Sequence, residues 1–432
     1  MTTDLNQPQP TNGWTAHPIR ELCSSIIDCV NKTAPVVGGP TPYRMIRTTN
    51  VRNGRVDVCS VRYVESDTYR RWVRRGEPRV GDIVLTREAP LGEVGMLRDA
   101  AGVFLGQRLV MYRADPERAN HHFLLYAMRG ASVQSQIKSL GSGSTVEHMR
   151  VPDCGELLIS CPDISAQRRI GATLAAFDEL IEINDRRIAI LEDLARSLYG
   201  EWFVRFRFPS HEGLDLVDSE LGPLPRTWSV QRLGEVASHI TRGVAPRYAD
   251  DGPWLVLNQR CIRDERVSLA AARRQERDVP EAKEVRFGDV LINSTGVGTL
   301  GRVAMFLLPT RQVTADSHVT IVRSESTDDH AWLGLCLRAR QAEFAAMGTG
   351  STGQTELSRQ SIGNLLVVVP DGCTLEAFSK VAWPLLNAVP ELAGFNERLV
   401  VTRDLLLPRL VTGRLDISDV DIDSLLDQAE SG

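Results

Sequence analysis

The sequence lacks the patterns that would place it in a membrane, in an oxidising compartment or among metalloproteins. None of its 432 residues belong to an apolar run approaching the roughly eighteen residues of a membrane-spanning helix. The start, MTTDLNQPQPTNG, has neither the basic residues nor the apolar centre of a secretory signal. The eight cysteines are scattered, without a Cys-x-x-Cys pair or a nearby histidine at metal-ligand spacing. We therefore expect a cytoplasmic protein with reduced, mostly buried thiols and no metal.

Signatures of catalysis on DNA are missing as well. No Asn/Asp-Pro-Pro-aromatic tetrapeptide of an amino methyltransferase is present, and Glu281-Ala-Lys283 has no Pro-Asp partner, so we interpret it as an exposed loop. The stretch GVGTLG (296–301) has the spacing of a dinucleotide-binding loop, but it leads into a second strand rather than a helix, which predicts a glycine-rich hairpin. The pair His121-His122 has no second ligand cluster. The sequence predicts neither an enzyme nor a cofactor.

The net charge of −5 is unevenly distributed along the chain. Residues 1–162 contain 20 Lys and Arg against 16 Asp and Glu, a net of +4, which leaves 30 against 39, a net of −9, for residues 163–432. Two basic clusters lie in the first part: Arg44, Arg47, Arg52 and Arg55, and Arg70, Arg71, Arg74, Arg75 and Arg79. Such clusters are either solvated faces or phosphate-binding surfaces, and charge alone leaves both interpretations open.

A long amphipathic helix is predicted over residues 163–208. Apolar residues recur there at alternating steps of three and four, and the polar Asn184 falls on the same seam. The apolar seam consists of Ile170, Leu174, Phe177, Ile181, Ile188, Leu191, Ala195, Leu198 and Trp202. Residues 166–204 alone would form a rod of about 58 Å, which suggests a spacer between two globular parts. We expect the acidic residues Asp178, Glu179, Glu182, Asp185, Glu192 and Asp193 on its outer face, facing solvent or a docked subunit.

The chain repeats itself with a period near 210 residues. YRMIRTTNVRNGRV (43–56) lies over WLVLNQRCIRDERV (254–267), and GDIVL (81–85) lies over GDVLI (288–292). In the same way GSGST (141–145) lies over GTGST (348–352). A short strand ending in proline and then a helical segment follow each Gly-Ser-Thr loop, so the predicted order is globular unit, helix, globular unit, helix.

Each globular unit is predicted to be a mixed α/β or α+β domain built around bent antiparallel strands, so the fold class is α+β. Short β-branched runs bounded by glycine or proline predict strands at 79–87, 103–112, 284–294, 302–308 and 319–323. Helical patterns lie near 120–140 and 330–347. The aromatic residues that end the long helix, Trp202, Phe203, Phe206 and Phe208, are expected to cap a helix pair or to pack on the second domain.

A second long helix is predicted over residues 375–407. Its seam consists of Phe378, Val381, Leu385, Ala388, Leu392, Phe395, Leu399 and Leu406. Since an interior proline costs about 3 kcal/mol or introduces a kink, Pro384 and Pro390 predict a bend or break near the start of this helix. The two seams are expected to pack as an antiparallel coiled coil in which Asn184 fixes the register.

Four stretches carry a resemblance to a known family. They are FDELIEINDRRIAILEDLARSLYGEWFVRFRFP (177–209), SELGPLPRTWSVQRLGEVA (219–237), STGQTELSR (351–359) and RDLLLPRLVTGRLDI (403–417). With these motifs the chain resembles, over nearly its whole length, the specificity subunit of type I restriction–modification systems. In that family two target recognition domains each read one half of a bipartite DNA site, and the repeated helices space them and bind two methyltransferase subunits.

The resemblance implies a non-catalytic subunit that binds double-stranded DNA, two methyltransferase subunits and restriction (translocase) subunits, without a cofactor. It implies pseudo-twofold symmetry and four parts: a recognition domain at 1–162, with about residues 1–12 disordered, the spacer helix at 163–208, a second recognition domain at 209–372, and a helix with a tail at 373–432. Two other classes remain open: a DNA-modifying enzyme with its own nuclease or methyltransferase centre, and a coiled-coil scaffold without DNA readout.

Candidate DNA contacts follow from the aligned positions of the repeat. Arg, Asn and Gln make bidentate contacts to guanine or adenine edges, while hydroxyl groups and backbone amides in glycine loops hold phosphates. We predict contacts from Arg44, Arg47, Asn50, Arg52, Asn53, Ser144 and Thr145 in the first unit, and from Asn258, Gln259, Arg260, Arg263, Ser351, Thr352 and Gln354 in the second. The alternative is that these are surface polar residues and tight glycine turns.

Overall fold

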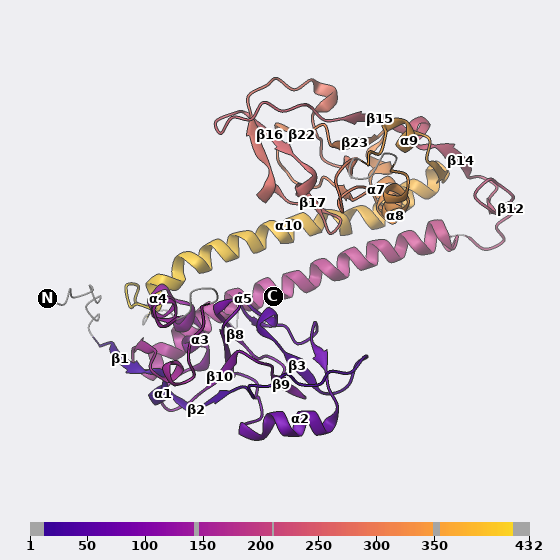
Figure 1. The fold of residues 1–432 in the computed structure, drawn as a ribbon. Coiled ribbons are helices and arrows are strands. Elements are labelled where there is room, and N and C mark those ends of the chain that lie inside the picture. The colour runs from indigo at the N-terminus through magenta and orange to yellow at the C-terminus, as the bar shows by residue number, and fades with distance from the viewer. Residues whose placement is uncertain (1–12, 142–146, 210, 349–354, 418–432) are drawn as a thin grey trace. The chain divides into compact units, whose positions relative to one another are not determined.

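The computed structural model describes residues 13–141, 147–209, 211–348 and 355–417. The chain divides into two compact units, unit 1 (Met1–Glu182 and Asn396–Gly432) and unit 2 (Ile183–Phe395). Two long helices, α5 (Ile164–Tyr199) and α10 (Gly372–Leu410), contribute residues to both units (Figure 1). The disorder predicted for about residues 1–12 lies outside the described residues.

Unit 1 contains a six-stranded sheet in the order β2-β10-β7-β8-β5-β4, a three-stranded sheet β6-β3-β9 and the pair β1-β11. Its strands are β1 (Thr15–Pro18), β2 (Cys23–Asp28), β3 (Arg44–Ile46), β4 (Val51–Arg52), β5 (Gly54–Val56), β6 (Arg62–Tyr63), β7 (Ile83–Arg87), β8 (Leu91–Met96), β9 (Val103–Leu105), β10 (Leu109–Ala114) and β11 (Leu158–Cys161). Its shorter helices are α1 (Ile19–Leu22), α2 (Ser66–Trp72), α3 (His121–Arg129) and α4 (Ala131–Leu140), with a 3-10 turn η1 at Thr48–Asn50.

Unit 2 repeats this arrangement with a four-stranded sheet β15-β23-β20-β21, a three-stranded sheet β19-β16-β22 and the pair β14-β24. Its strands are β12 (Leu216–Val217), β13 (Leu224–Pro225), β14 (Ser229–Arg232), β15 (Ala237–Arg242), β16 (Trp254–Leu257), β17 (Ile262–Arg263), β18 (Arg266–Val267), β19 (Arg273–Gln275), β20 (Val290–Asn293), β21 (Val303–Met305), β22 (Val313–Ala315), β23 (Val319–Ser324) and β24 (Leu366–Val369). Its shorter helices are α6 (Leu233–Val236), α7 (His330–Ala339), α8 (Gln341–Ala346) and α9 (Arg359–Gly363), with a 3-10 turn η5 at Gln259–Cys261.

The predicted repeat is confirmed by matching strand pairings in the two units. Besides the antiparallel pairs, each three-stranded sheet contains one parallel pair, β3 with β9 in unit 1 and β16 with β22 in unit 2. The expectation of antiparallel strands therefore missed these two pairs and a third parallel pair, β5 with β8 in unit 1. A parallel pair needs a long crossover connection, and the connections from β3 to β9 and from β16 to β22 include two strands of the larger sheet, β7 and β8 in unit 1 and β20 and β21 in unit 2, so no local signal could reveal them.

The central strands of both larger sheets are buried on both faces, with successive side chains in different cores. In β7, Ile83 and Leu85 pack in the core that includes α3, whereas Val84 packs in a second core with Val51. This alternation is the period-two geometry of a strand. In β20 the neighbours Val290 and Leu291 divide between two cores in the same way. Each unit is thus built around a sheet packed on both sides.

The seam predicted for α5 is confirmed. All nine of its apolar residues are buried or half-buried, and Asn184 is buried on the same face. In unit 1 the two long helices run antiparallel, because Asp178 contacts Arg403 while Ile181, further along α5, accepts a hydrogen bond from the earlier residue Asn396 at 3.2 Å. A second buried asparagine therefore also lies in the helix pair.

The seam predicted for α10 is correct at Phe378 and Leu399, which are buried, but wrong in its rotation between them. Val381 and Phe395 are 47% and 41% exposed, whereas their neighbours Ala382 and Asn396 are buried. Leu386 is buried as well. The buried stripe is therefore shifted by one residue over much of the helix.

The predicted break in α10 is also wrong, because the helix is continuous through Pro384 and Pro390. Each proline removes one backbone hydrogen bond, but the turns around them bury Ala382, Leu386 and Val389. Burial of an aliphatic side chain contributes roughly 1.5–3 kcal/mol. Packing therefore offsets the cost of the prolines.

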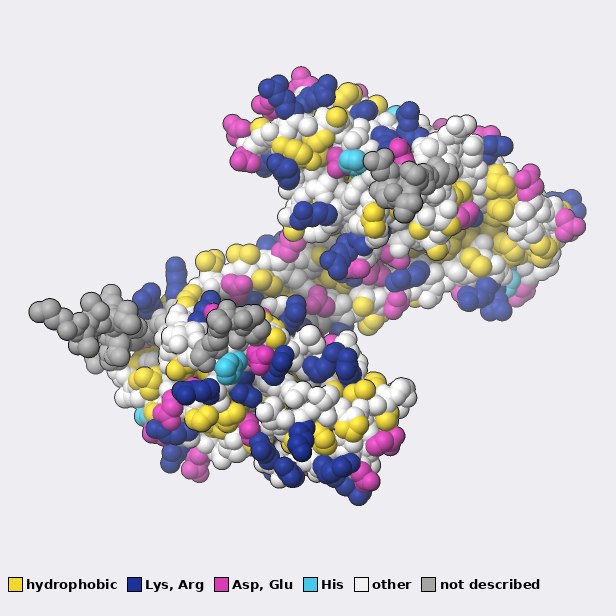
Figure 2. Space-filling view, viewed as in Figure 1, with side chains coloured by type: hydrophobic (Ala, Val, Ile, Leu, Met, Phe, Trp, Pro, Cys, Tyr) yellow, Lys and Arg dark blue, Asp and Glu magenta, His cyan; other side chains and the backbone are white. Residues whose placement is uncertain are grey.

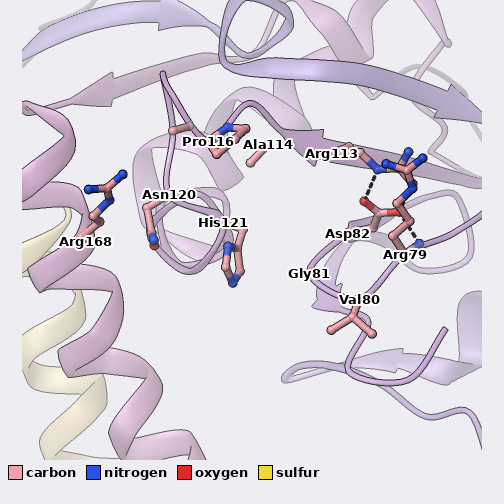
Figure 3. Close-up of a pocket in the computed structure, with 11 residues that line it drawn as sticks. Arg79, Val80, Gly81, Asp82, Arg113, Ala114, Pro116, Asn120, His121 and Arg168 are labelled. Carbon is pink, nitrogen blue, oxygen red and sulfur yellow. Dashed lines mark hydrogen bonds and ion pairs between the residues drawn. The ribbon is translucent and has the colours of Figure 1, made fainter.

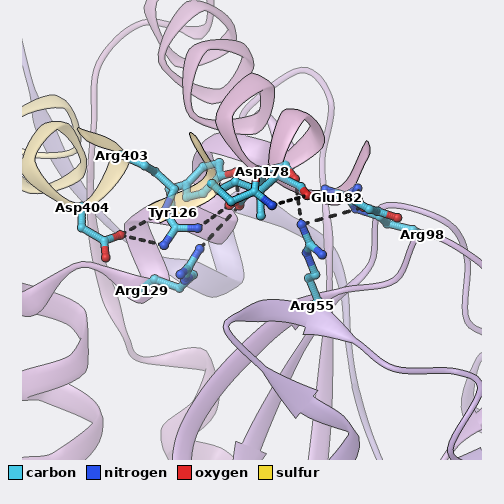
Figure 4. A network of polar contacts seen from close by, with 10 residues as sticks. Arg55, Arg98, Tyr126, Arg129, Asp178, Glu182, Arg403 and Asp404 are labelled. Atoms are coloured by element: carbon cyan, nitrogen blue, oxygen red, sulfur yellow. Dashed lines mark hydrogen bonds and ion pairs between the residues drawn. The ribbon is translucent and has the colours of Figure 1, made fainter. Parts of the chain in front are cut away.

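The predicted acidic outer face of α5 is correct in part: Glu179, Asp185 and Asp193 are exposed, whereas Asp178 is buried and Glu182 and Glu192 are half-buried. Asp178 is only 3% exposed and lies in a polar cluster in unit 1, where it contacts Arg403, accepts a hydrogen bond from Tyr126 Oη at 2.7 Å and lies 3.7 Å from Arg129 Nη1 (Figure 4). Burial lowers the pKa of Arg129. Glu182, one turn further along α5, pairs with Arg98.

In unit 2 an acidic residue of α5 likewise pairs with an arginine. Arg266 donates from two nitrogens to the two carboxylate oxygens of Glu192 at 2.8 and 2.6 Å. The counterpart of Arg266 in the repeat, Arg55, donates to the backbone oxygen of Asp178 at 2.7 Å. In both units an arginine from the β4–β5 or β17–β18 hairpin thus contacts α5.

The remaining expectations about packing are confirmed. Trp202 and Phe203 lie in the core of unit 2, with Phe206 and Phe208 packed against it. The described cysteines are all free thiols, and five of the eight are buried. Within the described part of the chain, every helix is too short or too polar to cross a membrane.

Candidate functional site

The predicted contact residues of unit 1 separate into structural and exposed positions. Asn50 is buried, and its side chain accepts from Arg47 N and donates to Ser60 O, both at 2.9 Å, so it closes the turn η1. Arg44 donates to Ala101 O at 3.1 Å from its Nε and pairs with Asp99 at 2.8 Å. These two side chains are held by the fold.

The other three predicted contacts of unit 1, Arg47, Arg52 and Asn53, are not held in this way. Arg52 and Asn53 are exposed on the β4–β5 hairpin, where Asn53 and Gly54 have φ of 53° and 82°. Consecutive positive φ values mark a type I′ turn, so Asn53 is explained by the turn alone. Arg47 is half-buried beside η1, and its Nε has no hydrogen-bond partner among the described residues. Arg52 is therefore the exposed cation of this set, whereas the unpartnered Nε of Arg47 is buried.

The aligned residues of unit 2 separate in the same manner. Asn258 accepts from Arg260 N at 2.9 Å and donates to Ala271 O at 2.6 Å, so it holds the turn η5 in place. Arg260 is exposed, and Arg263 is exposed beside Asp264 on the β17–β18 hairpin. Gln259 is half-buried, and its Nε2 donates to the hydroxyl of Thr295.

Five predicted contacts, Ser144, Thr145, Ser351, Thr352 and Gln354, lie outside the described residues. The segments that follow them are described, and each pairs with the end of a central strand. Glu88, after β7, pairs with His148, and Thr295, after β20, pairs with Glu356. Both pairings lie next to the 3-10 turn of their unit, since Thr48 contacts Ala89 and Gln259 contacts Thr295.

A polar cluster in unit 2 combines residues from three segments that are distant in sequence. Gln259 Nε2 donates to Thr295 Oγ1, and Thr295 Oγ1 lies 2.8 Å from Nδ1 of the exposed His318. The turn that presents His318 is fixed by Asp316, whose Oδ1 accepts from His318 N at 2.9 Å. Burial raises the pKa of the Asp316 carboxyl group.

Unit 1 has different side chains at the matching positions. Arg108 Nη2 lies 3.2 Å from Glu88 Oε1, and Thr48 Oγ1 donates to Ala89 O at 3.0 Å. The same backbone hydrogen bond shows that these positions match. Arg87 N donates to Arg108 O in unit 1, and Ser294 N donates to His318 O in unit 2, each at 2.8 Å.

Sequence analysis did not identify Glu88, Arg108, Thr295 and His318 as candidates. These positions lie between the aligned blocks of the repeat, where each unit has its own residues. The signal that could have identified them is that their side chains differ between the two units. Two related domains can bind different ligands at positions where the backbone is the same and the side chains differ.

An open groove in unit 2 lies next to this polar cluster. It has a volume of about 600 Å³ and is lined by Arg242, Lys283, Ser317, Glu356 and Arg359, among others. Arg242 pairs with Glu356 at 2.8 Å and donates to Ser317 O at 3.1 Å. Since Ser317 precedes His318, the basic groove continues into the cluster. A cationic groove beside side chains with free polar atoms suits a nucleic-acid strand.

The glycine motif at 296–301 forms the predicted hairpin. It connects β20 and β21, which pair antiparallel, and no helix follows it. Gly296 and Gly298 have φ of 103° and 71°, which explains the glycines by turn geometry. The tip residue Val297 is 89% exposed. The motif therefore presents a loop beside Thr295 rather than a cofactor site.

A pocket of about 310 Å³ in unit 1 is lined by Arg79, Asp82, Arg113 and His121, among others (Figure 3). Its charged pair has a structural explanation. Arg113 donates to both carboxylate oxygens of Asp82, at 2.8 and 2.7 Å, and in unit 2 the counterparts Arg323 and Asp289 form the same two bonds, at 2.8 and 2.6 Å. Burial lowers the pKa of His121. A pair retained in both units is a fixed part of the fold.

Basic side chains gather on unit 1 over α2 (Figure 2). Of the second cluster predicted there, Arg75 pairs with Asp28 and Arg71 donates to Asp67 O at 3.0 Å. In the described ranges no hydrogen bond or ion pair involves the exposed Arg70 and Arg74 side chains. No group of three or more His, Cys, Asp or Glu side chains suited to a metal occurs among the residues that the structure describes.

Comparison with known proteins agrees with this architecture. The family model described as the type I restriction modification DNA specificity domain matches residues 52–193. The type I restriction enzyme MjaIX specificity subunit of Methanocaldococcus jannaschii is 22% identical over 368 residues, which cover 79% of each chain. The HindI specificity subunit of Haemophilus influenzae is 20% identical over 360 residues, which cover 68% of this chain and 76% of that protein.

Among solved structures, the S subunit of the type I restriction–modification system from M. genitalium superposes with a TM-score of 0.64. The two chains are 18% identical, and the match covers 95% of this chain and 99% of that one. This likeness establishes a common fold. Taken with the family model and the curated relatives, it confirms the resemblance found in the sequence. Residues 52–193 match the DNA specificity domain of type I restriction–modification systems, and over most of its length the chain is similar to the specificity subunits of these systems.

Proposed function

We propose that this chain is the cytoplasmic, non-catalytic subunit that gives a type I restriction–modification complex its DNA sequence specificity. Each unit reads one half of a bipartite target in double-stranded DNA. The observation that carries the proposal is the duplicated backbone frame around Glu88 and Arg108 in unit 1 and around Thr295 and His318 in unit 2. One frame used twice with different polar side chains is what two related readers of different half-sites need.

The contacts of the duplicated frame support DNA as the ligand. Phosphate contacts position a protein on DNA, and side chains at base edges supply the specificity. In unit 2, Lys283 and Arg359 in the groove are suited to phosphate contacts, and the Gln259 cluster is suited to base-edge contacts. In unit 1 the proposed cations are the exposed Arg52 and the half-buried Arg47, which match Arg263 and Asn258 in the repeat. The contacts predicted at Ser144, Thr145, Ser351, Thr352 and Gln354 remain part of the proposal.

Two methyltransferase subunits and the restriction (translocase) subunits are the proposed partners. The long helices have apolar side chains that the fold leaves uncovered, and these support helix-to-helix docking of the methyltransferase subunits. In unit 2, Ile190 and Leu194 of α5 are 65% and 45% exposed. In unit 1, Val401 and Leu405 of α10 are 59% and 62% exposed. Each pair is spaced by four residues, so both members lie on one face of their helix.

A turnover assay separates this proposal from an enzyme with its own catalytic centre. The purified chain, incubated with double-stranded DNA and either S-adenosylmethionine or Mg²⁺, is expected to give no methylation and no cleavage. Addition of the methyltransferase subunits is expected to start sequence-specific methylation. Turnover by the chain alone would contradict the proposal.

A further inference from the structure

We propose that Gln259, Thr295 and His318 form the base-reading cluster of unit 2 and recognise an A·T pair, whereas Glu88 and Arg108 occupy the matching positions of unit 1 and recognise a G·C pair. This inference rests on the proposed function and assigns specificity within it.

The hydrogen-bond order in unit 2 fixes which polar atoms remain available. The amide Nε2 of Gln259 can only donate, so Thr295 Oγ1 accepts from it and its own hydroxyl hydrogen points to Nδ1 of His318, 2.8 Å away. His318 then carries its proton on Nε2. The cluster therefore presents one acceptor, Gln259 Oε1, and two donors, His318 Nε2 and the second hydrogen of Gln259 Nε2.

An acceptor next to a donor matches the major-groove edge of adenine, which offers the N6 amino group as a donor and N7 as an acceptor. Guanine offers two acceptors, N7 and O6, and would leave Gln259 Oε1 facing an acceptor. The cluster is held by its internal bonds and by the Asp316 contact to His318 N, so little side-chain freedom is lost when it binds. The exposed Val297 beside it can contact the thymine methyl group.

The matching positions in unit 1 have another set of polar groups. The Arg108 guanidinium is donor-only, and its side chain is 53% exposed although it pairs with Glu88 at 3.2 Å. Arginine donates in a bidentate manner to guanine O6 and N7, and a glutamate can accept from the N4 amino group of the paired cytosine. The pair thus complements both bases of a G·C pair.

The groove in unit 2 supports the assignment of His318 and Gln259 to bases rather than to phosphates. Besides Arg242, which pairs with Glu356, its cations are Lys283, which also donates to Gly243 O at 3.0 Å, and Arg359, and they line the groove with Ser317, where a phosphate backbone would be held. The cluster itself contains no lysine or arginine, so its contribution to binding is directional hydrogen bonding. Such contacts discriminate between bases, whereas cations bind every sequence alike.

The test places the side-chain types found at positions 88 and 108 of unit 1 at the matching positions of unit 2. The full chain carrying Thr295→Glu and His318→Arg is expressed with its methyltransferase subunits, and the methylated motif is read by methylome sequencing. We expect the half-site read by unit 2 to lose an A·T pair and to gain a G·C pair at one position, while the other half-site is unchanged. The double variant Gln259→Ala, His318→Ala is expected to relax the A·T preference by about 10- to 100-fold.

Arg108→Ala is expected to relax a G·C preference in the other half-site by a similar factor. Matched controls are Arg118→Ala, an exposed and ion-paired arginine of unit 1, and His211→Ala, an exposed histidine of unit 2, which should leave the motif intact. A bipartite wild-type motif that none of the variants alters would overturn this inference and leave the proposed function standing. A wild-type complex without a bipartite motif would overturn both.

Discussion

Replacement of Asp178 by alanine is expected to lower the free energy of unfolding of unit 1 by about 3–5 kcal/mol, because it leaves the largely buried Arg129 without a carboxylate and the buried Arg403 with only the more exposed Asp404. Tyr126 would lose its acceptor as well. The effect is measurable as faster hydrogen exchange of backbone amides in α3 and in the first half of α5. Glu376→Ala, which breaks the exposed pair with Lys380, is the control and should leave exchange unchanged.

The repeat supplies a sharper version of this experiment. At the positions that match Asp178 and Arg403, the chain has Leu386 and Ala195, both buried. The double variant Asp178→Leu, Arg403→Ala copies this apolar solution into unit 1. We expect it to be more stable than either single variant, because no unpaired charge from this pair remains. Single variants with full stability, or a double variant as unstable as the sum of the two, would contradict the role assigned to the cluster.

Removal of three cations from the DNA-facing side of unit 2 is expected to weaken DNA binding of the assembled complex by about 100- to 1,000-fold at 0.1 M salt. The variant is Lys283→Gln, Arg359→Gln, Arg260→Gln. Each phosphate contact contributes a slope of about −0.9 in the plot of log affinity against log salt concentration, so the total slope should fall by nearly three. Fluorescence anisotropy with a labelled duplex at several salt concentrations measures both quantities.

The matched control removes three other exposed cations of unit 2. Arg226 and Arg286 pair with Asp215 and Glu281, and Arg311 lies in an exposed loop. Their replacement by glutamine changes the net charge of the chain by the same amount. Equal losses of affinity in the two triple variants would indicate a general charge effect and would contradict a phosphate-binding groove.

The sequence predicted the elements whose signals are local and periodic. The seam of α5 was predictable because charged residues, among them Glu179, Asp185 and Arg187, lie between its apolar positions from Phe177 to Ala195. The rotation of α10 was not, because Leu385, Leu386 and their neighbours are apolar on adjacent faces, so two phases of the heptad fit equally well. Only the packed structure distinguishes them.

Long-range contacts account for the other differences. Asp178 looked like a surface residue of α5 because its partners, Arg403 and Arg129, are distant in sequence. The Gln259, Thr295 and His318 cluster has the same origin, since each residue comes from a different segment and none belongs to a recognisable motif. Conversely, Asn50 was predicted as a DNA contact from its residue type, and its amide is instead bonded to the backbone within its own turn.

The most direct test of the central claim is the methylome of cells that contain the methyltransferase subunits with and without this chain. We predict that methylation at one bipartite motif, made of two short defined half-sites separated by unspecified bases, requires the chain. We also predict that variants in unit 2 change only one half-site. Methylation that persists without the chain, or a single contiguous motif that changes throughout when unit 2 is altered, would contradict the account.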